Sequence, residues 1–321
     1  MSSTQPLGRS ELQVPRLGVG AMTWGDPPGL SRLTPAKLAY GGAEGALEEA
    51  RAFESSLAAS VTFFDTAAMY SNGASERRLG ELARGTAALI ATKFPPGMRS
   101  TAEDMPHALE ESLARMGRTN MDMDLYQHHY PTKRVDIPRL MGLMADAVAA
   151  GKVRAVGMSN YLADQMRIAH AVLAERGVPL ASNQVQYSLL HRQPETNGVL
   201  DTCRELGVTL IAYQPLASGA LTGKYLAGAR PRGLRRFTPT FRRSRREAVT
   251  PVVSLLREIG ARHDTGPTQV ALRWLIENNS VLPIPGAKNG AQAVANAQAL
   301  SFSLVPDEVE ALDRATLAWR E

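Results

Sequence analysis

Residues 123–131 read Met-Asp-Leu-Tyr-Gln-His-His-Tyr-Pro, a short apolar stretch that turns polar before it ends at a proline. Runs rich in β-branched, aromatic or other apolar residues recur along the chain, and such runs are typical of strands covered on both faces. Eight of them are present, at residues 17–23, 62–66, 88–94, 123–130, 153–159, 182–188, 208–214 and 281–285.

The segments between these runs have helical periodicity. In residues 100–117, Ser100 and Glu103 have the spacing of a capping box, and Gly117 follows the last apolar residue as a stop signal. Residues 137–150 place apolar side chains at i, i+4 and i+8, and residues 267–276 open on a proline, which favours a first helical turn. Strands and helices are therefore expected to alternate.

This alternation predicts the fold class. Eight alternations without a Pro/Gly/Ser-rich linker favour a closed (β/α)8 TIM-type barrel, with residues 1–321 as one domain, over a doubly wound sheet with a second domain. Residues 7–17, with a turn at 8–10, are expected to form an N-terminal β-hairpin that plugs the barrel floor. Residues 219–265 are expected to form a long basic loop after the seventh strand, on the active face.

The composition indicates a globular protein, since 44% of the 321 residues are hydrophobic and 21% are charged. No apolar run reaches the roughly 18 residues that a membrane span needs, and residues 1–9 lack the apolar stretch of a signal peptide. We therefore expect a cytoplasmic protein with no membrane partner. The one cysteine, Cys203, lies in an apolar-patterned helix with no histidine beside it, and is expected to be structural.

Positive charge is concentrated in one segment of a chain whose net charge is +5. The arginines of this segment are Arg230, Arg232, Arg235, Arg236, Arg242, Arg243, Arg245 and Arg246. Such a run forms either a solvated loop or a site for a local anion, which includes an anionic cofactor. Nucleic acid is a poorer partner, because only Phe237 and Phe241 accompany the arginines as stacking residues.

Polar side chains end three of the apolar runs. Asp65, Lys93 and His129 lie at these ends, and Tyr70 follows on the loop after Asp65. In a (β/α)8 barrel the carboxyl ends of the strands carry the reacting groups. Lys93, held by Asp65, is expected to stabilise the Tyr70 phenolate and lower the Tyr70 pKa, while His129 donates to a substrate oxygen. The alternative is a structural ion pair, with Tyr70 as a wall residue.

No metal site is expected from the two adjacent histidines. His128 and His129 are neighbours on one predicted strand, so their side chains project to opposite faces and do not share a metal.

Further motifs follow these residues in a fixed order. They are Asp65-Thr66-Ala67 with Tyr70, Thr92-Lys93, and residues 124–131, 157–161, 183–188, 212–216, 218–219, 221–225 and 284–288. As an ordered set they resemble the signatures of the aldo-keto reductases. The resemblance extends over nearly the whole chain.

The resemblance implies that Asp65, Tyr70, Lys93 and His129 reduce a small-molecule carbonyl compound, with Tyr70 as the general acid. It implies NADPH lying extended across the barrel mouth. The residues that would hold it are Ser159, Asn160, Gln184, Tyr213, Leu216, Ser218, Gly219, Leu221, Lys224, Gly286, Lys288, Gln292 and Asn296. The candidate substrate walls are Trp24, Phe94, His128 and Tyr130.

Within this set the resemblance implies separate contacts. Ser159, Asn160 and Gln184 would bind the carboxamide, and Tyr213 would stack on the nicotinamide ring. Ser218, Gly219 and Leu221 would wrap the pyrophosphate, Lys288 and Gln292 would meet the ribose and its 2′-phosphate, and Asn296 would contact adenine. Ala295 departs from the pattern, because a glutamate is expected beside Asn296.

A Rossmann site is not favoured. Gly18-Val19-Gly20 is followed by Thr23 at the place of the third fingerprint glycine, and no Tyr-x-x-x-Lys pair suggests a short-chain dehydrogenase. Two rival functions stay open: a nicotinamide-binding regulatory or redox-sensing subunit with little turnover, and a barrel with other chemistry, such as a metal-dependent hydrolase. The substrate, the preferred direction and the oligomeric state are not determined by the sequence.

Overall fold

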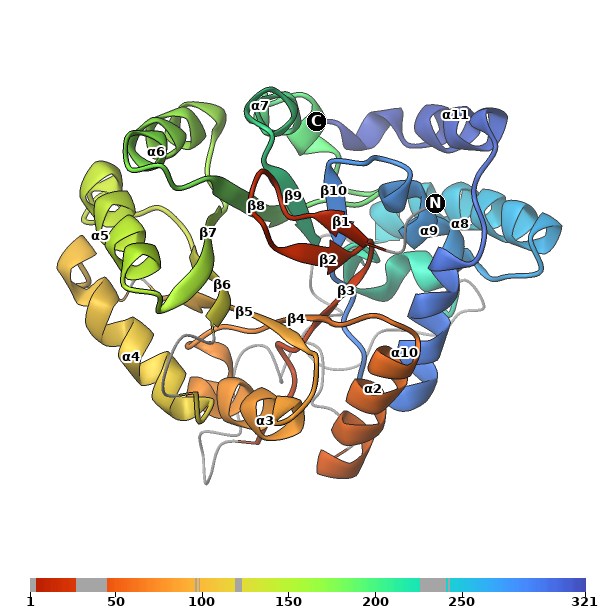
Figure 1. The fold of residues 1–321 in the computed structure, drawn as a ribbon. Helices are drawn as coiled ribbons and strands as arrows, with labels where there is room; N and C mark the ends of the chain where they lie inside the picture. The colour runs from red at the N-terminus through yellow and green to blue at the C-terminus, as the bar shows by residue number, and fades with distance from the viewer. Residues whose placement is uncertain are drawn as a thin grey trace.

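The chain folds into a parallel β-barrel surrounded by helices (Figure 1). The computed structural model describes residues 4–26, 45–95, 97, 99–118, 123–225, 241 and 243–321. The barrel strands are β3 (Gly18–Gly20), β4 (Phe63–Asp65), β5 (Leu89–Phe94), β6 (Met123–His128), β7 (Val153–Ser159), β8 (Leu180–Gln186), β9 (Thr209–Tyr213) and β10 (Val281–Pro283). They pair in parallel in chain order, and a bridge between Gly20 and Gly286 joins the two ends of the sheet. The predicted (β/α)8 barrel is confirmed.

The interior of the barrel is filled by one side chain from each of seven strands. This layer consists of Phe63, Ala91, Leu125, Ala155, Ala181, Ile211 and Leu282. The layer mixes small and large side chains, which is how a narrow barrel is packed closely. The strands are buried on both faces, and this explains why they appear in the sequence as nearly continuous apolar runs.

A hairpin of β1 (Thr4–Pro6) and β2 (Gln13–Pro15) lies across the amino ends of the barrel strands (Figure 1). Leu7, Leu12 and Val14 extend from it into the interior layer, and the Gly8 amide donates to Thr209 Oγ1 at 2.7 Å. The predicted hairpin on the barrel floor is confirmed. The hairpin begins at Thr4, before the predicted start at residue 7, and its two strands lie on either side of the expected turn at residues 8–10. Leu7 and Leu12 lie in the connection between the strands and also belong to the interior cluster.

Helices cover the outside of the barrel. They are α2 (Ala46–Ala58), α3 (Ala74–Ala83), α4 (Met105–Arg115), α5 (Ile137–Ala149), α6 (Ala163–Glu175), α7 (Val199–Leu206), α8 (Arg243–Arg262), α9 (Pro267–Ile276), α10 (Gly290–Ala297) and α11 (Pro306–Ala315). The 3₁₀ helices are η2 (Tyr70–Gly73), η3 (Ala102–Asp104), η4 (Gln193–Glu195), η5 (Ala217–Thr222), η8 (Gln298–Leu300) and η9 (Leu317–Trp319).

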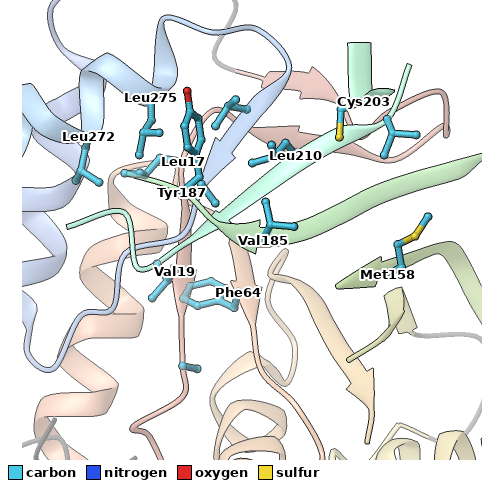
Figure 2. Packing of buried hydrophobic residues seen from close by; sticks show 14 of the residues in the cluster. Leu17, Val19, Phe64, Met158, Val185, Tyr187, Cys203, Leu210, Leu272 and Leu275 are labelled. Atoms are coloured by element: carbon cyan, nitrogen blue, oxygen red, sulfur yellow. The ribbon is translucent and has the colours of Figure 1, made fainter. Parts of the chain in front are cut away.

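The outer faces of the strands and the inner faces of the helices form one apolar cluster. Figure 2 shows part of it, with Leu17 and Phe64 from the barrel and Leu272 and Leu275 from α9. Cys203 of α7 belongs to this cluster, and burial raises the pKa of its thiol to about 12, as expected for a structural cysteine. Among the described helices, none has both the length and the apolar composition needed to cross a bilayer.

The long segment after β9 is not a loop throughout. Its second half is the helix α8, which buries Val252, Leu256 and Ile259 at i, i+4 and i+7. In the sequence, the high arginine content of residues 230–246 favoured a loop for the whole segment, and the apolar stripe of α8 was not recognised. Arg230, Arg232, Arg235, Arg236 and Arg242 lie outside the described residues, as do residues 27–44 and the side chains of residues 243–246.

The capping box after β5 lies one residue later than predicted, and it precedes a 3₁₀ turn. Thr101 and Asp104 form the capping box, and α4 follows η3 to Arg115. Ser100 instead accepts a hydrogen bond from the Gly97 amide, and Glu103 accepts two from the Arg139 guanidinium. The pair Ser100 and Glu103 had the same spacing, so spacing alone did not distinguish the two registers.

The packing of the hairpin predicts the effect of a methyl group at Gly8. Gly8 has φ +60°, and a Cβ there would lie 2.4 Å from the Ala181 carbonyl oxygen. We expect Gly8→Ala to lower the free energy of unfolding by about 3 kcal/mol, because a clash with backbone adds to left-handed strain. Gly177→Ala is the matched control, with φ +67° and open space, and should cost only about 1 kcal/mol. Urea unfolding measures both free energies, and an equal decrease in the two variants would contradict this interpretation.

Candidate active site

A cavity of about 790 Å³ opens at the carboxyl ends of the strands, opposite the hairpin. Its walls come from the segments that leave many of the strands, as expected for the active face of this fold. The lining residues are Gly20, Met22, Thr23, Asp65, Tyr70, His129, Tyr130, Ser159, Asn160, Gln184, Tyr213, Gln214, Pro215, Leu216, Ser218, Gly219, Thr222, Lys224, Thr268, Ile284, Pro285, Gly286, Lys288, Gln292, Ala295 and Asn296.

A buried ion pair lies at the base of this cavity. Asp65 is the last residue of β4, Lys93 lies near the end of β5, and Lys93 Nζ donates to Asp65 Oδ1 at 2.5 Å. Lys93 is fully buried and also donates to the Thr66 carbonyl oxygen at 2.8 Å. Burial by itself would lower the pKa of Lys93, but Asp65 and Tyr70 outweigh it and raise that pKa. Lys93 is therefore a cation.

Two amides complete the surroundings of the carboxylate. Gln184 Nε2 donates to Asp65 Oδ2 at 2.8 Å, and Gln127 Nε2 donates to the same oxygen at 3.3 Å. Both glutamines are buried. Gln127 was not among the residues predicted for the site, although it interrupts the apolar run of β6 in the same way that Lys93 interrupts β5.

Tyr70 lies against this pair at the start of η2, with Lys93 Nζ 5.0 Å from the centre of its ring. Ser71 and Asn72 follow it with φ of 49° and 54°, a left-handed conformation that is uncommon outside glycine. Burial raises the pKa of Tyr70; Lys93 opposes this increase, and Asp65 adds to it. The expected lowering of this pKa was therefore wrong, because loss of solvent outweighs the neighbouring charge.

The two histidines at the end of β6 have different surroundings. The His129 ring meets Tyr70 edge to face, with 5.6 Å between ring centres, and burial with the nearby Lys93 lowers the pKa of His129 to about 3. His128 turns away. Its Nδ1 forms a 2.6 Å hydrogen bond with the Tyr161 hydroxyl, its ring stacks on Phe94, and burial lowers its pKa to about 4. His129 is therefore a neutral imidazole at the cavity wall.

Amides and hydroxyls continue from the ion pair along one wall of the cavity. Asn160 has φ +61° and donates through Nδ2 to Ser159 Oγ at 3.0 Å, and the Tyr213 hydroxyl donates to Asn160 Oδ1 at 3.0 Å. Ser159 Oγ donates to the Gln184 carbonyl oxygen at 2.8 Å. The predicted set is thus brought together, and it presents amide donors and acceptors beside an aromatic ring.

The opposite end of the cavity combines left-handed backbone with lysines. Gln214, Ser218 and Gly219 all have positive φ on the segment after β9. Lys224 and Lys288 line the same cavity. Helix α10 begins nearby. The Asn289 side chain caps it by accepting a hydrogen bond from the Gln292 backbone N–H at 2.9 Å, and Asn296 Nδ2 donates to the Gly286 carbonyl oxygen at 3.3 Å. This end is suited to anionic groups.

Comparison with known proteins agrees with this geometry. A family model described as Aldo/keto reductase family matches residues 16–316. The chain belongs to the aldo-keto reductase family. Aldo-keto reductase str7 of Strobilurus tenacellus is 34% identical over 96% of this chain and 90% of its own.

Two further proteins are similar to this aldo-keto reductase. Aldo-keto reductase yakc of Schizosaccharomyces pombe, whose name includes NADP(+), is 32% identical over 76% of this chain and 75% of its own. The solved structure of a glycerol dehydrogenase from Gluconobacter oxydans has a TM-score of 0.81 at 22% identity, over 98% of this chain and 94% of its own. The latter shows the shared fold. The family makes this chain an oxidoreductase that uses a nicotinamide cofactor and small carbonyl substrates.

Five of the predicted residues of this aldo-keto reductase lie outside the cavity lining, and they are Lys93, Trp24, Phe94, His128 and Leu221. Lys93 is fully buried beside Asp65, which lines the cavity. Trp24 is fully buried, and its Nε1 donates to the Ala287 carbonyl oxygen at 2.7 Å. Lining residues absent from the predicted set include Met22 and Thr23 on the segment after β3, Gln214 within the motif at residues 212–216, and Thr268 in the first turn of α9.

The burial of His129 predicts how it titrates. Its pKa of about 3 lies below the usual 6.5, so the unfolded chain binds a proton in this window that the folded chain does not. Acidification from about pH 6.5 therefore removes stability. We expect the NMR shifts of the His129 ring nitrogens to stay those of neutral imidazole from about pH 8 to about pH 5, and to titrate near the reference value in urea. Assignment uses His129→Asn. A folded-state midpoint near the reference value would contradict the burial argument.

Proposed function

We propose that this aldo-keto reductase reduces an aldehyde or ketone to an alcohol with NADPH, and that Tyr70 is the general acid. The chain is proposed to act as one domain, residues 1–321. The observation that carries the proposal is the Lys93–Asp65 pair, sealed beneath a tyrosine that faces the cavity. A structural ion pair would not require a hydroxyl and a neutral histidine on the cavity side of the lysine.

The polar wall of the cavity fits a nicotinamide. Ser159, Asn160 and Gln184 would bind its carboxamide, and Tyr213 would lie against its ring, since amide pairs and an aromatic shelf match these two groups. When bound, the reduced cofactor supplies a hydride. The left-handed backbone at Ser218 would turn amides toward the pyrophosphate.

The phosphate-binding end supports NADPH over NADH. Lys288 lies beside the start of α10, where a cation and a helix amino terminus both favour the 2′-phosphate. Gln292 Oε1 accepts from the Lys288 amide at 3.0 Å, which links the two residues proposed for the ribose. Asn296 and Ala295 line the neighbouring wall, where adenine would lie. The NADP(+) in the name of the Schizosaccharomyces pombe relative is consistent with this choice.

The chain's own groups account for the proton. Because its pKa is raised, Tyr70 carries its proton at neutral pH and can donate it to the carbonyl oxygen as the hydride reaches the carbonyl carbon. Lys93 then stabilises the phenolate that Tyr70 becomes. His129, being neutral, can donate an N–H to the same oxygen and fix its direction. The product is the alcohol, and Tyr70 regains a proton from solvent.

Tyr130 is the best placed of the proposed substrate walls. It lines the cavity and its ring meets His129 edge to face at 5.5 Å. Met22 and Thr23 join it in the lining. Phe94 and His128 stack on each other outside the lining and would act by fixing the end of β6, where the Phe94 carbonyl oxygen accepts from the His129 backbone N–H. Trp24 would fix the segment after β3 through its bond to Ala287.

The direct test is NADPH oxidation by the wild type and Tyr70→Phe over a panel of aldehydes and ketones, with NADPH and NADH binding titrated in parallel. We expect the variant to bind NADPH as the wild type does and to lose at least about a hundredfold in kcat, as removal of a general acid predicts. Binding of NADPH should exceed that of NADH. The wild-type rate should fall only at alkaline pH, where Tyr70 loses its proton.

Tyr187→Phe is the control, because Tyr187 is a buried tyrosine that lies outside the cavity and whose hydroxyl donates to Glu195. It should leave kcat unchanged. If both the wild type and Tyr70→Phe bind NADPH but neither turns over any carbonyl compound, a regulatory or sensing role replaces the reductase proposal. If the wild type binds no nicotinamide, the cofactor proposal is wrong.

A further inference from the structure

We propose that Gln127 is a positioning residue for catalysis, whose amide holds the Asp65 carboxylate in place when the cofactor occupies Gln184. Ser182 orients this amide, and Gly157 leaves the space in which the two side chains meet. The inference rests on the proposed reductase function.

The register of the sheet brings these residues into one row. Gln127 of β6 pairs with Gly157 of β7, which pairs with Ser182 of β8, and Lys93 of β5 is the neighbour of Gln127 on the other side. A Cβ at Gly157 would lie 2.2 Å from Ser182 Oγ and 3.3 Å from Gln127 Cγ. The absence of a side chain in the middle of the row therefore allows Ser182 and Gln127 to reach each other across β7.

The hydroxyl of Ser182 determines the orientation of the amide. Ser182 Oγ donates to Gln127 Oε1 at 3.3 Å, so the oxygen of the amide turns toward β8. The nitrogen then faces β4 and donates to Asp65 Oδ2 at 3.3 Å. Gln127 and Ser182 have no exposed surface, so water does not compete for either bond.

Asp65 Oδ2 accepts from two glutamines that differ in one respect. Gln184 lines the cavity, whereas Gln127 does not. A carboxamide bound at Gln184 would compete for its amide, and Gln127 would then be the donor that stays on Asp65 Oδ2. Asp65 in turn holds Lys93 by Oδ1, and Lys93 lies against Tyr70. The chain Ser182, Gln127, Asp65, Lys93 and Tyr70 thus connects the barrel interior to the proton donor.

The alternative is that Gln127 merely fills the barrel interior. An apolar side chain of the same length would fill the space equally well, but it would leave Asp65 Oδ2 without a hydrogen-bond donor that lies outside the cavity. The two roles therefore predict different results for Gln127→Met, which keeps the volume and removes the donor.

The test measures kcat, KM and NADPH affinity of the wild type and Gln127→Met. Urea unfolding curves first establish conditions under which both proteins are folded. We expect kcat for carbonyl reduction to fall about tenfold, as loss of one hydrogen bond to a charged group predicts. The KM for the carbonyl substrate and the Kd for NADPH should stay within about twofold, since Gln127 touches neither ligand.

The pH profile of Gln127→Glu separates positioning from packing. The introduced carboxyl would lie beside Asp65 in a buried site, where burial and like charge keep it protonated to a higher pH than usual. While protonated it donates to Asp65 and should support near wild-type kcat; once ionised it repels Asp65, so kcat should fall. We expect this additional fall with rising pH only in Gln127→Glu, and not in Gln127→Met or the wild type.

Ser182→Ala is a milder variant that removes only the bond orienting the amide, and we expect a loss of kcat of about threefold. Its matched control is Ser56→Ala, which removes an equally buried hydroxyl from α2, outside the site, and should leave kcat unchanged. If the wild type turns over and Tyr70→Phe does not, but Gln127→Met and Gln127→Glu keep the wild-type kcat and pH profile, the inference is wrong while the reductase function stands. If the wild type itself has no activity and binds no nicotinamide, the proposed function fails first.

Discussion

The buried pair of Lys93 and Asp65 is the constraint on which the rest of the site depends. Moving a lysine into a barrel interior costs several kcal/mol unless its charge is met by a carboxylate and its remaining protons by other acceptors. Here Asp65 and the Thr66 carbonyl oxygen accept from Lys93, and Gln184 and Gln127 donate to Asp65. Lys93 lies on β5, whereas its partners and theirs come from the end of β4, from β6 and from β8, so the charge is met only when the barrel is assembled.

The fold divides stability and chemistry between the two ends of the barrel. The hairpin and the interior side chains close the amino end, where Gly8 approaches the Ala181 carbonyl so closely that no side chain fits. At the carboxyl end, Ser71, Asn160 and Ser218 adopt left-handed conformations without being glycine. Such positions cost on the order of 1–3 kcal/mol each and persist when the surrounding packing determines them.

Much of this arrangement was predictable, because apolar runs locate strands and strand ends locate the cavity. Asp65, His129 and Lys93 were found in this way. Gln127 was missed, since its importance comes from Ser182 two strands away. The direction of the Tyr70 pKa was missed because burial depends on the chain packed around the ring, whereas the sequence shows only which charges lie nearby. Similarly, Trp24 is an aromatic residue of the kind that lines substrate sites, but it is fully buried and its indole Nε1 donates to the Ala287 carbonyl oxygen.

The ion pair is proposed to serve proton donation by Tyr70 and not the stability of the fold. The most direct measurement is therefore single-turnover hydride transfer from NADPH in the double variant Asp65→Asn, Lys93→Met, beside its urea unfolding curve. Replacing a buried pair by neutral groups of similar size is often neutral for stability, so we expect a folded protein that binds NADPH. Its hydride transfer should be slower by at least about a hundredfold, because Tyr70 keeps its hydroxyl but loses the cation that stabilises its phenolate. A double variant that transfers hydride at the wild-type rate would contradict the account, and would make the pair a structural element only.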